Sequence, residues 1–372
     1  MDQDFKEFID RVYDEGVRGA SQPRESILRM LAADPLSEEV LYMRERANEL
    51  ARIACDNKAV LSGAVGVDMC SCDMNCKFCS FGTEWDLIKE DIIFTKEQVI
   101  ALAKKYVEAG VTTLTLRSTE FYDLATLAEW LKDIRAEVPG GYLINLNVGE
   151  MTPAMAEAAY QAGATSAYHV NRMREGIDTP FDPALREETI MAISNSPLRL
   201  STGVEPVGIE HTDEEIADKI LRNLTYRPYS MCVMLRINVP GTPFEGYETV
   251  SHERMLQLIA VARLACGTKV RCIATHPATP EALRSGANSL TVECGANPRD
   301  VEFNDDVWRG FKVTDAVNMF LDAGFDMGPV DPDPRFRADG NNWWVTGDPA
   351  QYEMPDPRLN ATGCCGKSSK KK

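Results

Sequence analysis

From residue 60 onward, short apolar runs alternate with longer amphipathic stretches, and this alternation limits the folds available to the chain. The pattern is typical of βα units arranged around a parallel sheet. Eight such units in roughly 230 residues match the size of a closed barrel. We therefore predict an α/β fold, a (β/α)8 TIM-type barrel, with an open doubly wound sheet as the alternative. The predicted strands are residues 63–69, 112–117, 142–148, 165–170, 198–204, 232–239, 269–275 and 288–293.

The segments on either side of the barrel divide the chain into three parts. Residues 1–60 carry helical patterns and are expected to form an N-terminal helical segment that covers the barrel floor. Residues 61–305 form the predicted barrel. Residues 306–372 are expected to add one helix, 313–325, and then an irregular, partly disordered tail rich in Pro, Gly, Asp and Asn.

The charge balance excludes some classes of partner. The 372 residues include 57 acidic and 40 basic side chains, and the net charge of −17 repels phosphate backbones and anionic membrane surfaces. We expect no nucleic-acid partner and no membrane. The N-terminus lacks the basic and apolar run of a signal peptide, and no apolar stretch reaches 18 residues. These features predict a cytoplasmic protein.

Eleven cysteines are many for a cytoplasmic chain, where disulfides are rare, so metal binding or catalysis is their leading use. Four of them, Cys70, Cys72, Cys76 and Cys79, fall within ten residues directly after the first predicted strand. The tail pair 364–365 is expected to be unstructured rather than to ligate a second cluster. Small buried apolar positions are expected for Cys55, Cys232, Cys266, Cys272 and Cys294.

The cysteine-rich loop has a spacing that suits an iron–sulfur cluster. Three thiolates in one short loop can occupy three corners of a [4Fe-4S] cubane and leave the fourth iron open. A closed zinc site needs four ligands, usually in two separated pairs, and the obvious extra thiol, Cys70, is only two residues from Cys72. We predict Cys72, Cys76 and Cys79 as the cluster ligands, with zinc binding as the alternative.

The motif Cys72-x-x-x-Cys76-x-Phe78-Cys79 resembles the signature of the radical S-adenosylmethionine superfamily. The resemblance implies that S-adenosylmethionine binds the open iron and is cleaved to a 5′-deoxyadenosyl radical. A second spacing, Cys70-x5-Cys76-x2-Cys79, resembles the radical enzyme implicated in assembling the guanylylpyridinol cofactor of [Fe]-hydrogenase. We expect Cys72 to be the third ligand and Cys70 to be a neighbouring thiol.

Likeness to one branch of the superfamily extends along the barrel. Residues 239–244 and 285–290 resemble segments of biotin synthase, whose branch includes methylornithine synthase and the maturase of [FeFe]-hydrogenase. The resemblance implies that S-adenosylmethionine binds at the ends of the second, fourth and fifth strands, where Glu120 can accept a hydrogen bond from its ammonium group. The implied cofactor-binding residues are Ser118, Thr119, Glu120, Asn171, Arg172, Gly203 and Glu205.

The chain departs from biotin synthase at the second cluster. Biotin synthase holds a sulfur-donating [2Fe-2S] cluster with three interior cysteines and an arginine. Arg271 stands at the position of that arginine. The segments that match the cysteine positions, residues 114–116, 145–147 and 198–200, contain no cysteine. Strand alternation is expected to turn Cys272 away from the side to which Arg271 points. The chain is therefore not expected to be biotin synthase itself.

A polar barrel interior is expected to bind the substrate where the second cluster is missing. The predicted pocket residues are Arg271, Arg236, Asn145 and Asn147, and the two arginines can bind a carboxylate or phosphate by paired hydrogen bonds. The alternative is that one arginine pairs with Glu205 or Glu293 for structure alone.

These features predict a radical S-adenosylmethionine enzyme of an anaerobic cytoplasm. It is expected to abstract hydrogen from a small polar, anionic substrate during biosynthesis of a cofactor or modified amino acid, with a reductant such as flavodoxin or ferredoxin as its partner. One alternative is biosynthesis of the guanylylpyridinol cofactor, suggested by Cys70 and the missing second cluster. Another is a non-catalytic iron–sulfur or zinc-binding protein.

Overall fold

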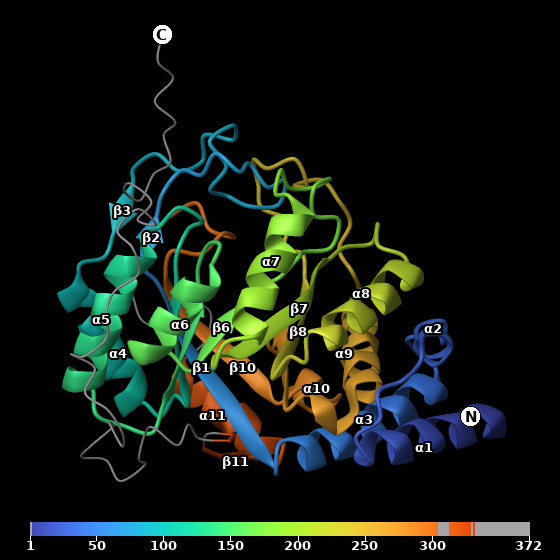
Figure 1. Cartoon of the computed structure of the whole chain (residues 1–372). Coiled ribbons are helices and arrows are strands. Elements are labelled where there is room, and N and C mark those ends of the chain that lie inside the picture. Colours follow the sequence, from blue (N-terminus) through green and yellow to red (C-terminus); the bar gives the residue numbers. More distant parts are fainter. Residues whose placement is uncertain (1, 304–311, 329, 332–372) are drawn as a thin grey trace.

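Eight parallel strands form a closed ring surrounded by helices in the computed structural model, which describes residues 2–303, 312–328, 330 and 331 (Figure 1). The pairing of the last strand with the first closes the ring. The (β/α)8 prediction is confirmed, and the open doubly wound alternative is wrong. In order around the ring, the strands are β1 (Lys58–Gly66), β4 (Thr113–Arg117), β5 (Leu143–Asn147), β6 (Ser166–Tyr168), β7 (Arg199–Val207), β8 (Ser230–Leu235), β9 (Cys272–His276) and β10 (Ser289–Gly295).

The first strand differs most from its predicted range of 63–69. Strand β1 ends at Gly66, where a Cβ atom would lie 2.0 Å from the carbonyl oxygen of Ala296. Only glycine allows this close approach of two backbone segments. Beyond it, β2 (Asp68–Met69) pairs antiparallel with β3 (Ile92–Ile93), so the chain leaves the barrel before the cysteine-rich loop begins.

Side-chain caps start the helices that cover the barrel. At the first of these helices, Thr95 Oγ1 accepts from the backbone N–H of Gln98, and Gln98 Oε1 accepts from the N–H of Thr95. This reciprocal pair fixes where the helix begins. The helices are α4 (Lys96–Glu108), α5 (Leu124–Glu137), α6 (Pro153–Gln161), α7 (Pro183–Ser194), α8 (Asp213–Thr225), α9 (His252–Cys266), η1 (Gly267–Lys269, a 3-10 helix), α10 (Pro280–Leu283) and α11 (Val313–Asp322).

The N-terminal segment lies at the lower end of the molecule and along one flank, rather than only beneath the barrel (Figure 1). Its helices are α1 (Gln3–Val17), α2 (Arg24–Leu31) and α3 (Glu38–Ala54), which pack on one another and on α8 and α9. Gln257 on α9 ties them to the barrel layer by donating to the carbonyls of Met30 and Ala33 at 2.9 and 2.8 Å.

The C-terminal helix predicted at 313–325 is present as α11, and β11 (Asp326–Met327) then pairs with the start of β1. The predicted irregular tail, with the cysteine pair 364–365, lies outside the described residues. Within the described chain, no helix is both long enough and apolar enough to cross a lipid bilayer.

Polar side chains line the inside of the barrel, where bulky branched side chains are usual. Ser62 Oγ lies 2.8 Å from Thr115 Oγ1, and Asn145 Nδ2 donates to the same Thr115 oxygen at 3.4 Å. Ser166 Oγ donates to Asn145 Oδ1 at 2.9 Å, so hydrogen bonds link four neighbouring strands. Because these side chains are short, they leave a cavity of about 360 Å³, which we call the lumen.

Candidate active site

The cysteine-rich loop closes the upper end of the lumen. The backbone N–H of Cys72 donates to the carbonyl of Phe81 at 2.6 Å, and the N–H of Thr83 donates to the carbonyl of Cys72 at 3.1 Å, so the two ends of the loop are tied together. Asn75 adopts a positive φ of 45°, a conformation that asparagine tolerates better than most residues. The loop is therefore held in shape by its own backbone.

Three of the four clustered thiols open into the same lumen. Cys72, Cys76 and Cys79 line it, whereas Cys70 is 1 % exposed and is absent from the lining. Burial raises the pKa of Cys72 to about 11 and that of Cys79 to about 12. Without a metal these thiols are therefore neutral, and coordination to a metal ion would deprotonate them.

At least two of the three lumen sulfurs are farther apart than two ligands of one zinc ion. Among the described residues, the sulfurs of Cys72, Cys76 and Cys79 do not all lie within 4.8 Å of one another. Zinc with four bonds of about 2.3 Å to sulfur brings its ligands to roughly 3.8 Å from one another. The arrangement as it stands does not form a zinc site, and three thiolates could occupy three corners of a cubane and keep one iron open.

The end of β4 brings the predicted residues Ser118, Thr119 and Glu120 to the lumen. The side chain of Asp68 holds this turn, because its Oδ1 accepts from the backbone N–H of Thr119 at 2.8 Å and its Oδ2 accepts from the Thr119 hydroxyl. Burial raises the pKa of Asp68 to about 6. The hydroxyl of Thr119 is thus already committed to Asp68.

Glu120 lies in an ion-pair network of two carboxylates around one arginine. Arg186 Nη2 is 3.1 Å from Glu120 Oε2, and Arg186 Nη1 is 2.9 Å from Glu150 Oε1. His169 Nε2 lies 3.1 Å from Glu150 Oε2, so the histidine is a satisfied interior residue. Burial raises the pKa of Glu120 to about 7, while the hydrogen bond with His169 and the charge of Arg186 outweigh burial and lower the pKa of Glu150 to about 2.

Arg172 and Glu205 line the lumen, but two other predicted cofactor residues do not. Asn171 turns toward α7, where its Nδ2 donates to the carbonyl of Pro183 at 3.4 Å. Gly203 has a different role from the one predicted, since a Cβ atom there would lie 2.1 Å from Cys232 Sγ. The glycine makes room for a neighbouring thiol, and this packing explains its place without a bound nucleoside.

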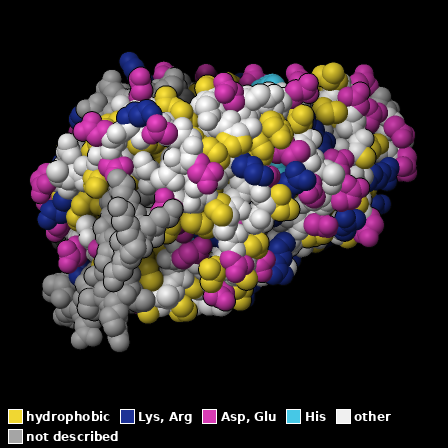
Figure 2. Space-filling view, turned by 90° about the horizontal axis from the view of Figure 1, so that it is seen from above, with side chains coloured by type: hydrophobic (Ala, Val, Ile, Leu, Met, Phe, Trp, Pro, Cys, Tyr) yellow, Lys and Arg dark blue, Asp and Glu magenta, His cyan; other side chains and the backbone are white. Residues whose placement is uncertain are grey.

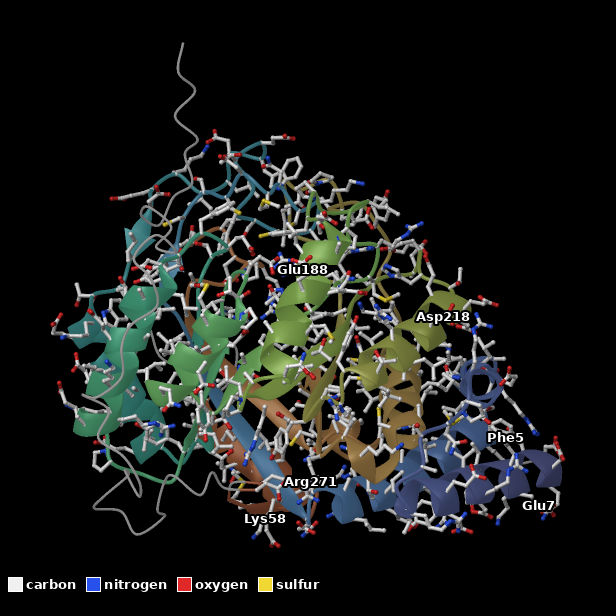
Figure 3. The ribbon with its side chains drawn as sticks, in the orientation of Figure 1. Phe5, Glu7, Lys58, Glu188, Asp218 and Arg271 are labelled. Atoms are coloured by element: carbon white, nitrogen blue, oxygen red, sulfur yellow. The ribbon has the colours of Figure 1, made fainter. Side chains whose placement is uncertain are left out.

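Arg271 lies at the opposite end of the barrel from the cluster loop, which corrects its predicted place in the pocket. Figure 3 shows it beside Lys58 at the base of the molecule. It precedes β9, and its Nε donates to Asp331 at 2.7 Å while its Nη2 donates to Asp56 at 2.5 Å. Cys272 lines the lumen, so the alternation of β9 has the opposite phase to the one predicted.

Among the other predicted pocket residues, Asn145 and Asn147 line the lumen, and so does Arg236. The guanidinium of Arg236 is occupied: it contacts Glu210, donates to Asn238 Oδ1 at 2.9 Å and lies 4.5 Å from the centre of the Phe244 ring. Neither Arg236 nor Arg271 forms a described ion pair with Glu205 or Glu293, the two partners considered from the sequence.

Two arginines of the lumen, Arg117 and Arg299, were not among the predicted site residues. Arg117 Nη1 is 2.6 Å from Glu293 Oε1, and Arg299 contacts the other carboxylate oxygen. Although Glu293 is buried, these two charges hold its pKa well below the usual range. Burial lowers the pKa of the nearby His276 to about 4. For Arg117 the signal available in the sequence was its position at the end of a predicted strand, where barrel active sites lie, whereas Arg299 lies beyond the last predicted strand.

A charged cluster fastens the cysteine-rich loop to the rim of the barrel. Lys77 Nζ donates to Asp178 Oδ1 at 3.1 Å, and Asp178, Glu210 and His211 lie close enough together to suggest a cation site. Both carboxylates are already paired with a cation, Lys77 or Arg236, so the group is electrically balanced. In the view from above, onto the end of the molecule that carries the cysteine-rich loop, acidic side chains are spread around the rim (Figure 2).

Comparison with known proteins gives relatives at low identity. No protein-family model matches the chain. Biotin synthase of Alkalilimnicola ehrlichii is 24% identical over 254 residues, 63% of this chain and 75% of the relative. Biotin synthase of Shewanella frigidimarina is 24% identical over 283 residues, 70% of this chain and 79% of the relative.

Two solved structures share the fold. Methylornithine synthase superposes with a TM-score of 0.72 at 18% identity, covering 86% of this chain and 97% of that protein. The [FeFe]-hydrogenase maturase of Carboxydothermus hydrogenoformans gives a TM-score of 0.69 at 16% identity, covering 87% of this chain and 79% of that protein.

A closed barrel with three thiols opening into the upper end of its lumen, together with the sequence similarity to biotin synthases, supports a radical S-adenosylmethionine enzyme of the biotin synthase-like superfamily.

Proposed function

We propose that this enzyme abstracts hydrogen from a small polar, anionic substrate held in the barrel lumen, in the biosynthesis of a cofactor or modified amino acid. The observation that carries the proposal is one continuous cavity with Cys72, Cys76 and Cys79 at one end and hydrogen-bonding side chains along its walls. When bound, the cluster and S-adenosylmethionine supply a 5′-deoxyadenosyl radical by one-electron cleavage.

The chain's own residues position the reactants. The carboxylate of Glu120 is suited to accept a hydrogen bond from an ammonium group, and Arg186 on its other side keeps it in place at 3.1 Å. Arg172 can still donate to a carboxylate, since its Nη1 makes no hydrogen bond in the described chain, although it lies 3.6 Å from Glu175 Oε1. The buried walls exclude water, which protects a reactive intermediate from side reactions.

Cys72 is favoured over Cys70 as the third ligand by its place in the lumen. Cys70 is buried next to Asp68 and does not line the cavity shared by Cys76 and Cys79. The longer spacing is therefore disfavoured, and of the two features that suggested the guanylylpyridinol alternative only the missing second cluster still supports it. We further propose flavodoxin or ferredoxin as the reductant and an anaerobic cytoplasm as the location.

The test compares Cys72→Ala with Cys70→Ala after anaerobic reconstitution with iron and sulfide. The wild type and Cys70→Ala should each bind about four irons and four sulfides and release 5′-deoxyadenosine on reduction, whereas Cys72→Ala should lose both properties. Loss in Cys70→Ala with retention in Cys72→Ala would show that the longer spacing binds the cluster. Bound zinc without cleavage of S-adenosylmethionine in the wild type would refute the enzyme function.

A further inference from the structure

The lower end of the lumen carries a guanidinium that the proposed chemistry does not use. Arg199 is the first residue of β7, and it lines the same lumen as the cluster cysteines. Its Nη1 atom is buried and has no hydrogen-bond partner in the described structure. Arginine stays protonated in proteins, so this atom is a donor attached to a permanent positive charge.

Every other arginine that lines the lumen lies against a carboxylate. Arg199 is the exception, because it forms no ion pair among residues 2–303, 312–328, 330 and 331. Its carboxylate-bound counterparts are Arg117 and Arg299 on Glu293, Arg172 on Glu175, Arg186 on Glu120 and Glu150, and Arg236 on Glu210.

Asp331, a carboxylate near Tyr229 at the floor of the lumen, is already paired with another arginine. Asp331 influences the pKa of Tyr229, but both of its oxygens bind Arg271, at 2.7 and 3.0 Å. The guanidinium of Arg199 instead lies 4.9 Å from the centre of the Tyr229 ring, and the Tyr229 hydroxyl donates to the carbonyl of Val330 at 2.6 Å. The aromatic ring orients the guanidinium without neutralising its charge.

Small hydroxyl side chains surround this position. Ser166 is the register partner of Arg199 on β6, and Ser201, the next lumen-facing residue of β7, pairs in register with Ser230 on β8. All three serines line the lumen. A ligand at the floor therefore meets one fixed positive charge and several neutral hydrogen-bonding groups.

We propose that the floor of the lumen is an anion-binding subsite in which Arg199 holds a carboxylate group of the substrate. This inference rests on the proposed function and names the substrate class: an elongated carboxylic acid whose acidic end points away from the cluster. A single guanidinium balances a monoanion, whereas a phosphate monoester would leave an uncompensated negative charge in a buried site. From Arg199 to Glu205 at the upper end of β7, six residues span roughly 20 Å of strand, so the substrate is extended along the barrel axis.

The test measures binding of hexanoate and hexanamide to the cluster-loaded enzyme by titration calorimetry, under anaerobic conditions. Hexanoate should bind the wild type, and Arg199→Gln should weaken its binding at least tenfold, while hexanamide should bind both proteins equally weakly. Arg222→Gln is the matched control, because it removes an exposed guanidinium that lies outside the lumen and pairs with Glu187, and it should leave hexanoate binding unchanged. Ser201→Leu, which fills the lumen above Arg199 and leaves its charge intact, should also weaken hexanoate binding.

Equal binding of hexanoate by the wild type and Arg199→Gln would overturn the subsite, as would tighter binding of butyl phosphate than of hexanoate. Release of 5′-deoxyadenosine separates this failure from failure of the proposed function. If the wild type releases 5′-deoxyadenosine but hexanoate binds the wild type and Arg199→Gln equally, the radical chemistry is supported and the subsite is refuted. If Arg199→Gln weakens hexanoate binding but the wild type releases no 5′-deoxyadenosine, the subsite is supported and the proposed function is refuted.

Discussion

Gly203 and Cys232 share one small volume on neighbouring strands of the barrel. The Cys232 sulfur occupies the space that a side chain on residue 203 would fill, and it lies 3.6 Å from the Tyr168 hydroxyl and 3.5 Å from Glu205 Oε2. Burial and the adjacent Glu205 carboxylate raise the pKa of Cys232 far above its ordinary value, so the thiol is neutral. At the residue scale, a glycine predicted to touch the cofactor is explained by packing.

Substitution of Gly203 tests this packing. Gly203→Ala would place a methyl group 2.1 Å from Cys232 Sγ, and overpacking of this kind costs about 1–3 kcal/mol of unfolding free energy. The double variant Gly203→Ala with Cys232→Ala should recover most of that loss in denaturant unfolding. No recovery in the double variant would mean that the glycine is required for another reason.

The pH dependence of stability can be assigned in part to His276. Its pKa of about 4 in the folded protein lies below the ordinary value of 6.5 because it is buried. Between pH 6.5 and 4 the unfolded chain binds the proton more readily, so this histidine's contribution is complete above pH 6.5 and is lost as the pH falls toward 4. His276→Gln should reduce the loss of unfolding free energy between pH 6.5 and pH 4 by up to about 3 kcal/mol, measured by urea unfolding. An unchanged pH profile would contradict the assignment.

At the scale of elements, the two ends of the parallel strands serve different purposes. The upper ends carry the residues that face the cluster loop, and the lower ends are joined to the flanking segments. Arg271 before β9 links Asp56 after α3 to Asp331 after β11, and it also donates to the carbonyl of Ala54. This arginine therefore connects the barrel to the N-terminal helices and the C-terminal strand.

Removal of the Arg271 guanidinium should affect stability rather than catalysis. We expect Arg271→Met to lower the unfolding free energy by about 1–2 kcal/mol, because the partly buried hydrogen bonds at the floor are lost. The rate of 5′-deoxyadenosine release from the reconstituted variant should equal that of the wild type. A lower rate with unchanged stability would return Arg271 to the active site.

At the scale of the whole molecule, we expect the barrel to fold without the cluster. The ring is closed by backbone pairing of β1 with β10 over seven register positions, and an apolar core lies between the strands and the outer helices. The cysteine-rich loop extends from the upper end of this ring, where Lys77 donates to Asp178 and the backbone N–H of Ser80 donates to the carbonyl of Pro298. Its apolar residues pack in a cluster of their own, separate from the main core.

Chelation of iron should therefore change the loop but not the barrel. We expect the far-ultraviolet circular dichroism of the iron-depleted enzyme to match that of the loaded enzyme, while limited proteolysis cuts the depleted form within residues 70–85. This behaviour differs from that of a small zinc domain, which unfolds without its metal. Loss of the dichroism signal on chelation would show that the cluster holds the barrel together.

The fold and the gathering of three thiols in one loop could be predicted because their signals are local. Alternating apolar runs specify strands and helices wherever they stand, and Cys72, Cys76 and Cys79 come together in one short loop. The chain itself thus determined a barrel with three thiols after its first strand. The strand ends were right to within four residues, except that β1 begins five residues before its predicted start.

The tertiary structure alone decided which side chains reach the lumen and which charges remain unpaired. Arg271 and Cys272 are neighbours in sequence. The register of β9 places the Cys272 thiol in the lumen and the Arg271 guanidinium outside it, next to Asp331. Arg236 meets Glu210 and Arg199 meets no described carboxylate because ion pairs form between residues distant in sequence. Pairing of charges depends on distance in space, and a sequence pattern records only distance along the chain.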